Sequence, residues 1–251
     1  MKNDLKVFII LLIIITLVGG VFLFIDFDGG NDIPVVPIPS GDTQNYDNNL
    51  AAKVVVQDVV VRNKTDNRNI DCVYPSIKSL SDKEFENSIN KEIAQNIQAY
   101  REEMEFMVDE ETPATTLYNF VTSYDKYTCK NYLSLVIDQS YQTGGIRSEK
   151  WKDIYNINAK TERIFYLNEL FEVGVDFQTA IISEVTNQAT SKNIELMGGN
   201  GLTKLDTKQK FYIKDNKLFI YFDPSEAAAT VFGELHFEMP FVMNEEGYFE
   251  I

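Results

Sequence analysis

Histidine and cysteine, from which many catalytic and metal sites are built, are scarce in this sequence. Its 251 residues include one histidine, His236, and two cysteines, Cys72 and Cys129. Neither cysteine belongs to a C-x-x-C motif or has a histidine nearby, so no zinc site is indicated. No G-x-S-x-G motif provides a nucleophile for the histidine to activate. We therefore expect no catalytic residues, no metal and no cofactor, and a protein that is not an enzyme.

The residues around His236 have the alternation of a strand with one polar face. Glu234 and Glu238 fall on the same side as His236, and the apolar residues Leu235, Phe237 and Met239 fall on the other side. We expect this polar face to be solvated, because a zinc site at E-x-H-x-E would need a further ligand from elsewhere in the chain.

Positive charge is also scarce. The chain has 23 Lys and Arg against 38 Asp and Glu, a formal net charge of -15. Such a surface repels nucleic acid and anionic lipid headgroups and attracts basic partners. The acidic residues are so numerous that paired carboxylates for glycoside cleavage cannot be located by sequence alone.

One long hydrophobic run dominates the N-terminal region. Residues 7–25 carry no charge, and about 20 apolar residues are enough to cross a bilayer. Lys2 and Lys6 precede the run, whereas Asp26 and Asp28 follow it, which places the N-terminus in the cytoplasm. We expect a six-residue cytoplasmic tail (1–6), a transmembrane anchor in the cell membrane (7–25) and an extracellular remainder. Cleavage after Gly20, as in a signal peptide, stays open as the alternative.

The next residues, 26–52, are rich in Gly, Pro, Asn and Asp and predict a flexible spacer. Valine-rich residues 53–62 and residues 70–74 predict two strands, the second ended by Pro75. The S-x-x-E motif from Ser81 to Glu84 predicts a capping box. The helix that follows has its core face at four-residue steps, at Phe85, Ile89, Ile93 and Ile97. Two long antiparallel strands are expected at 115–128 and 132–141.

A similar set of elements follows. We expect a strand from residue 151 to 158, a turn at 168–171 and a second amphipathic helix with Phe177, Ile181, Val185 and Ala189 on one face. A hairpin is predicted at 211–222 around Asp215-Asn216, then a turn or short helix at 224–230 and a strand at 234–239. The order predicts an α+β fold of antiparallel sheets, each packed by an amphipathic helix, in two similar halves, 53–143 and 144–251.

Two further features concern the exported region. Cys72 and Cys129 both lie in predicted strands, where a disulfide could persist; a bridge and two free buried thiols are both open. Glu102, Glu103 and Glu105 fall at the C-terminal end of the first helix, where the helix dipole disfavours negative charge. A solvated helix end and a docking surface for a cationic protein both remain open.

Five short segments occur in an order that points to a known family. They are residues 74–93 (YPSIKSLSDKEFENSINKEI), 141–145 (YQTGG), 166–171 (YLNELF), 222–233 (FDPSEAAATVFG) and 239–241 (MPF). Together they resemble the paired extracellular domains of RsiV-type anti-sigma factors, which also precede the catalytic domain in PdaC-type peptidoglycan deacetylases. The resemblance covers about residues 53–251.

The resemblance implies a cell-envelope receptor for lysozyme, a strongly basic protein, with a partner surface at Pro224, Ser225, Glu226 and Thr230. The chain departs from the family pattern at residues 144–148, which read GGIRS where the family has Gly-Gly-Ala-His-Gly. Two tyrosines of the family's partner loop are also missing. A six-residue tail offers no sigma-binding segment, and no catalytic domain is expected to follow. A membrane-anchored binding or sensing domain is the first expectation, and a peptidoglycan-associated accessory domain or hydrolase is the alternative.

Overall fold

The computed structural model describes residues 49–107, 117–143, 148–197 and 201–251. The predicted tail and anchor, and nearly all of the predicted spacer, lie outside these ranges. Among the described residues, no helix is long and apolar enough to cross a membrane. The described residues form a mixed α+β structure with two α-helices.

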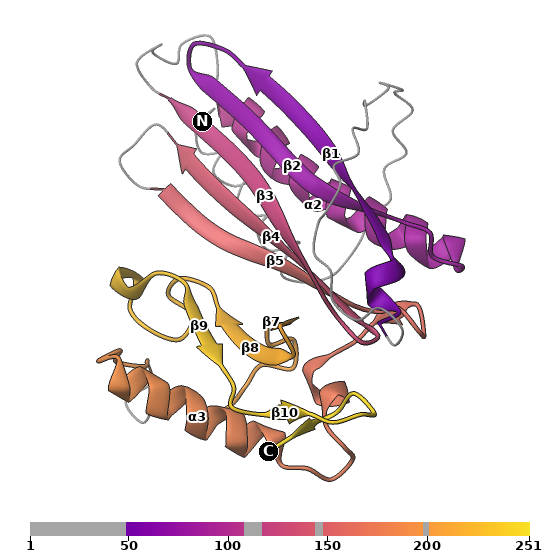
Figure 1. The fold of residues 1–251 in the computed structure, drawn as a ribbon. Coiled ribbons are helices and arrows are strands. Elements are labelled where there is room, and N and C mark those ends of the chain that lie inside the picture. Colours follow the sequence, from indigo (N-terminus) through magenta and orange to yellow (C-terminus); the bar gives the residue numbers. More distant parts are fainter. Residues whose placement is uncertain (1–48, 108–116, 144–147, 198–200) are drawn as a thin grey trace. The chain divides into compact units, whose positions relative to one another are not determined.

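The larger sheet has six strands whose spatial order follows the sequence, from β1 to β6. Helix α2 (Lys83–Met107) lies along one face of this sheet (Figure 1). Its Ile89, Ile93 and Ile97 are buried against Leu133, Leu135 and Ile137 of the sheet, which confirms the predicted core face of the helix. The strands are β1 (Val55–Lys64), β2 (Arg68–Lys78), β3 (Tyr118–Cys129), β4 (Tyr132–Thr143), β5 (Ser148–Asn158) and β6 (Arg163–Ile164).

Two details of this sheet differ from the prediction. Strands β2 and β3 pair in parallel, because α2 returns the chain to the other end of the sheet before β3 begins. Strand β2 also continues through Pro75 to Lys78 rather than ending at the proline. The pairing of β2 with β3 ends at Cys72, so Pro75 has a strand neighbour on one side only, where it faces Asp58. A proline without an N–H is tolerated at such an edge.

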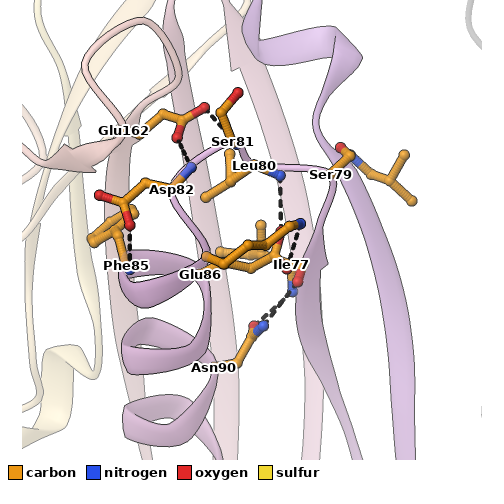
Figure 2. A network of polar contacts seen from close by, with 11 residues as sticks. Ile77, Ser79, Leu80, Ser81, Asp82, Phe85, Glu86, Asn90 and Glu162 are labelled. Carbon is orange, nitrogen blue, oxygen red and sulfur yellow. Dashed lines mark hydrogen bonds and ion pairs between the residues drawn. The ribbon is translucent and has the colours of Figure 1, made fainter.

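A polar network fixes the corner between β2 and α2 (Figure 2). Asp82, rather than the predicted Ser81, is the N-cap of α2, and its carboxylate accepts a hydrogen bond from the Phe85 N–H at 2.9 Å. The Ser81 N–H instead donates to the Glu162 carboxylate at 2.9 Å, and the Asp82 N–H donates to the other oxygen of Glu162 at 2.5 Å. The Asn90 side chain exchanges two hydrogen bonds with the backbone of Ile77.

The second half of the chain builds a three-stranded antiparallel sheet from β7 (Phe211–Lys214), β8 (Lys217–Phe222) and β9 (Leu235–Glu238). The β7–β8 hairpin has the predicted bounds, and its turn residues Asp215 and Asn216 have φ values of 52° and 60°. These left-handed conformations match the twist of a two-residue hairpin, and Asp and Asn tolerate them well.

Helix α3 (Phe177–Ser191) packs against one face of this smaller sheet and confirms the second predicted core face. Its Ile181, Val185 and Ala189 share a buried cluster with apolar residues of β7, β8 and β9. The remaining short elements are β10 (Val242–Met243), β11 (Phe249–Glu250), and the 3-10 turns η2 (Ala51–Lys53), η3 (Leu167–Leu170) and η4 (Thr230–Phe232).

The two sheets contact each other through the faces that the helices leave free. Val136 of β4 is buried with Tyr212 and Tyr221 of the smaller sheet. Strand β5 pairs with β4, although the predicted division between the halves falls at 143/144. The larger sheet therefore includes residues from both predicted halves, and all described residues fall within one compact unit.

The two cysteines are free and buried in different apolar clusters. Cys72 pairs with Thr122 of β3, and Cys129 lies seven residues farther along that strand. At roughly 3.3 Å per residue this separation is about 23 Å, far more than a disulfide can span. The possible bridge is therefore not formed.

Candidate partner-binding loop

The candidate site is the loop of residues 224–232, called here the contact loop, which leaves β8 and leads to β9. At its start the Glu226 carboxylate accepts a hydrogen bond from the Asp223 N–H at 2.7 Å. Ser225 has a φ of 69°, a left-handed conformation that is uncommon for serine. Its hydroxyl lies 2.6 Å from the Thr230 hydroxyl and so ties the two ends of the loop together. The structure thus brings Pro224, Ser225, Glu226 and Thr230 into one closed turn.

Two small residues hold the base of the contact loop in the core. Ala227 and Ala228 are 6% and 2% exposed, respectively. Ala228 forms an isolated β-bridge with Leu196, and the Ala227 carbonyl accepts a hydrogen bond from the Met197 N–H at 2.8 Å. Backbone hydrogen bonds to a neighbouring segment and buried side chains give this loop a defined position.

The tip of the contact loop presents apolar side chains to solvent. Val231 is 86% exposed and Phe232 is 37% exposed. Folding gains little from an apolar side chain left in water, whereas a partner that covers Val231 and Phe232 would gain from their burial. The contact loop therefore combines a fixed base with two exposed apolar side chains.

Asp223 connects the start of the contact loop to the larger sheet. Its carboxylate accepts hydrogen bonds from the Lys210 ammonium at 2.5 Å and from the Tyr221 hydroxyl at 2.9 Å. The same ammonium donates to the Lys152 carbonyl of β5 at 2.7 Å. Lys210 therefore links the contact loop to the free edge of β5.

A small hollow lies beside the contact loop. Its volume is about 270 Å³, and its lining includes the buried Leu205, Gln209 and Phe222. Leu202 also lines it, as do the exposed Lys204, Asp206 and Glu226. Although Glu226 is exposed as a residue, partial desolvation of its carboxylate raises its pKa, and the carboxylates of Asp223 and Asp206 add to the increase. This hollow could not be predicted from the sequence, because its lining comes from a loop without periodicity, from the end of β8 and from the contact loop.

The acidic end of α2 does not form a single cluster. Glu102 accepts a hydrogen bond from Gln98 at 2.6 Å, and Glu105 lies 3.9 Å from Arg101. The third carboxylate, that of Glu103, is partly buried, and burial together with the neighbouring Glu149 raises its pKa. Two of the three predicted carboxylates therefore have partners within their own helix.

His236 is half-buried rather than fully solvated as predicted. Its Nδ1 lies 3.1 Å from the Tyr212 hydroxyl, and its Nε2 lies 3.8 Å from Glu234. Glu234 is also 3.4 Å from the buried Lys152 of β5. The pKa of Glu234 is lowered by the nearby His236 side chain and by the Lys152 ammonium. The larger sheet covers this face of β9, a long-range contact that strand alternation does not reveal.

Within the described residues, no three His, Cys, Asp or Glu side chains are grouped so that they could hold a metal ion. Aromatic residues do gather, but Tyr127, Tyr212 and Phe219 stack on one another, with ring centroids 5.7 Å and 4.9 Å apart. Tyr212 in the middle of this stack is 8% exposed, so both of its ring faces are used inside the protein.

Comparison with known families confirms the resemblance of the five segments. Residues 61–146 match the family model described as Deacetylase PdaC, and residues 168–242 match that of a protein family of unknown function, DUF3298. The chain therefore carries the PdaC-type and DUF3298 domain pair that the order of its motifs predicted. The contact loop and the hollow lie in the DUF3298 segment. No curated protein matches the sequence.

Two solved structures share the fold. A DUF3298 family member from Bacteroides fragilis NCTC 9343 is 15% identical with a TM-score of 0.54, and the match covers 74% of this chain and 90% of that one. A DUF3298 family protein from Pseudomonas aeruginosa PAO1 is 8% identical with the same TM-score of 0.54, over 76% of this chain and 92% of that one. At these identities the likeness concerns the fold alone.

Proposed function

We propose that this protein is a non-enzymatic binding domain of the cell envelope that recognises a basic protein through the contact loop. The observation that carries the proposal is the exposure of Val231 at 86% in a loop whose base is buried and hydrogen-bonded. The formal net charge of -15 supports a basic partner, and the match to a deacetylase family and to DUF3298 fits an envelope location. Lysozyme is the candidate partner, because it is the ligand implied by the resemblance to RsiV-type ectodomains.

Residues 7–25 would anchor this domain in the cell membrane, with residues 1–6 in the cytoplasm and the described region outside. The charge difference across the hydrophobic run supports this orientation.

Calorimetry with lysozyme tests the proposal. The full chain in detergent micelles should bind lysozyme, and Val231→Asp should weaken binding about tenfold or more by placing a charge in the apolar centre of the interface. Val173→Asp is the matched control, because Val173 is a fully exposed valine in another loop. Equal affinities of the two variants would exclude the contact loop as the binding surface.

A salt series separates two modes of recognition. Raising the salt from about 0.05 to 0.5 M shortens the Debye length from roughly 14 to 4 Å, so binding by charge alone should disappear. Binding through buried contacts should change by less than about tenfold. In that case changes at Pro224, Ser225, Glu226 or Thr230 should matter more than charge reversal at Glu102, Glu103 or Glu105. Absence of binding to the folded protein at low salt would remove lysozyme as the partner.

A peptidoglycan-associated accessory or hydrolytic domain is the second candidate. The observation in its favour is the hollow, whose lining includes two carboxylates, those of Asp206 and Glu226, together with apolar side chains. Its volume of about 270 Å³ is slightly below the roughly 300 Å³ at which ligand pockets begin. Titration with a soluble peptidoglycan fragment distinguishes this candidate from the first.

A further inference from the structure

The hollow beside the contact loop has an unusual balance of polar groups. Asp206 and Glu226 carry carboxylates, and Gln209 adds a side-chain amide. The lining has one cationic residue, Lys204, which is exposed and can turn its ammonium into solvent. An ionised carboxylate accepts hydrogen bonds but donates none. The lining therefore favours a ligand that donates several hydrogen bonds and carries positive charge.

Gln209 adds an oriented hydrogen-bond acceptor to the lining of the hollow. The residue is only 5% exposed, and its Nε2 donates to the Tyr221 carbonyl at 2.8 Å, which fixes the orientation of the amide. Its Oε1 accepts no hydrogen bond from any residue in the described part of the chain. This oxygen is open to solvent in the lining of the hollow, so a hydrogen-bond donor from outside the protein can reach it.

The remaining lining is apolar. Leu205 and Phe222 are 3% and 2% exposed, and Leu202 completes the surface. An occupant should therefore have an aliphatic portion to lie against these side chains and a polar cation at its end. The volume of about 270 Å³ suits one side chain better than an oligosaccharide.

We propose that this hollow receives an arginine side chain of the basic partner. The methylene groups of the arginine pack on Leu202, Leu205 and Phe222, and the guanidinium donates to Gln209 Oε1 and to the carboxylates of Asp206 and Glu226. A guanidinium has five N–H donors in a plane, which matches several separate acceptors better than the compact ammonium of lysine. This inference rests on the proposed function, because the arginine belongs to the same basic protein that the contact loop recognises.

A small probe tests the hollow without any partner protein. In two-dimensional NMR of the full chain in detergent micelles, N-acetyl-arginine amide should shift the signals of Gln209 and its neighbours and saturate with a Kd on the order of 1–10 mM. N-acetyl-norleucine amide, which is aliphatic and uncharged, should bind at least about tenfold more weakly. Equal binding of the two amides, or no saturation by the arginine amide, would overturn the proposal.

Two variants of the lining complete the test. Glu226→Gln keeps an acceptor for the Asp223 N–H but removes the charge, and it should weaken arginine-amide binding about tenfold. Leu202→Trp should fill the hollow and abolish binding. Glu245→Gln, at an exposed residue outside the lining, is the matched control and should have no effect. Saturation by N-acetylglucosamine in place of the arginine amide would assign the hollow to carbohydrate and reject an arginine anchor.

The two proposals can fail separately. If lysozyme binds the wild-type chain and the Leu202→Trp variant equally well, the arginine anchor is wrong but the contact loop remains a binding surface. If the arginine amide saturates the hollow and lysozyme does not bind, the hollow is a guanidinium site and the basic partner is a different protein.

Discussion

Asn156 of β5 donates a hydrogen bond from its Nδ2 to the Phe211 carbonyl of β7 at 2.8 Å, across the contact between the two sheets. Its Oδ1 accepts a hydrogen bond from the Ser134 hydroxyl at 2.7 Å, and the oxygen of that hydroxyl accepts one from the Ile213 N–H at 3.1 Å. Ser134 and Asn156 are 0% and 6% exposed, so this chain of hydrogen bonds is shielded from water.

Ser134→Ala should therefore destabilise the protein. The substitution leaves the Ile213 N–H and the Asn156 Oδ1 buried without partners, at about 1–3 kcal/mol for each group. The free energy of unfolding in urea measures the loss. Ser140→Ala is the control, because Ser140 makes an exposed hydrogen bond with Ser148, and it should change stability by less than about 0.5 kcal/mol. Equal losses of unfolding free energy for the two substitutions would show that the buried hydrogen bonds of Ser134 contribute no more stability than the exposed one of Ser140.

The start of α2 gives a second prediction. Asp82→Ala removes the side chain that caps the Phe85 N–H and should cost about 0.5–2 kcal/mol. Ser81→Ala should cost much less, because Ser81 uses its backbone N–H in the hydrogen bond with Glu162. Thermal unfolding of both variants tests the assignment, and the reverse order of stability would restore Ser81 as the cap.

Glu162 should contribute stability that depends on pH. Hydrogen bonds from the Asp82 and Ser81 N–H groups hold the pKa of its carboxyl below the usual value of 4.5 in the folded protein. A lowered folded pKa means that the contribution is fully present above the unfolded pKa and is lost as the pH falls through the folded pKa. Glu162→Gln should thus lower the melting temperature at pH 7, and the difference from wild type should shrink below about pH 4.5. Glu245→Gln, at an exposed residue, should show no such trend.

Both cysteines should be unreactive in the folded protein. Burial raises the pKa of the Cys72 and Cys129 thiols to about 11, so few thiolates are present near neutral pH. A thiol reagent added at pH 8 should react slowly with the native protein and should modify both cysteines after denaturation without a reductant. Failure to find free thiols after denaturation would mean that the two cysteines form a bridge.

The predicted topology can be tested on cells. Protease added to intact protoplasts should degrade the exported region and leave a fragment no larger than the anchor and tail, because residues 7–25 and their flanking charges place the C-terminal part outside. Complete protection of the chain would contradict this orientation, and release of the whole exported region before protease is added would favour a cleaved signal peptide.

Local patterns in the sequence predicted most of the elements but not their long-range pairing. The Asp215-Asn216 turn and the four-residue spacing of Ile89 and Ile93 depend on neighbouring residues alone, so they could be read directly. The parallel pairing of β2 with β3 and the continuation of β2 through Pro75 depend on which strand lies alongside, which alternation does not specify.

The candidate site could be predicted only in part, because local patterns again do not specify long-range contacts. The contact loop was located by its resemblance to a family segment, and the structure shows that Ser225 and Thr230 meet there. The hollow needed the fold, because Gln209 and Glu226 are 17 residues apart and lie together only through the β7–β8 hairpin. Gln209 does not stand out by type or spacing, and Glu226 was identified only through the family resemblance.

The position of β5 determines how this protein can be divided. Strand β5 (Ser148–Asn158) falls between the two family matches, which end at residue 146 and begin at residue 168. It is nevertheless a full strand of the larger sheet and carries Asn156, which holds β7. A fragment cut at either family boundary would expose the edge of β4 or leave β7 without its anchor. The two families are thus not separable modules in this chain. A chimaera built from the halves of two relatives would fold only if β5 kept compatible neighbours in both β4 and β7.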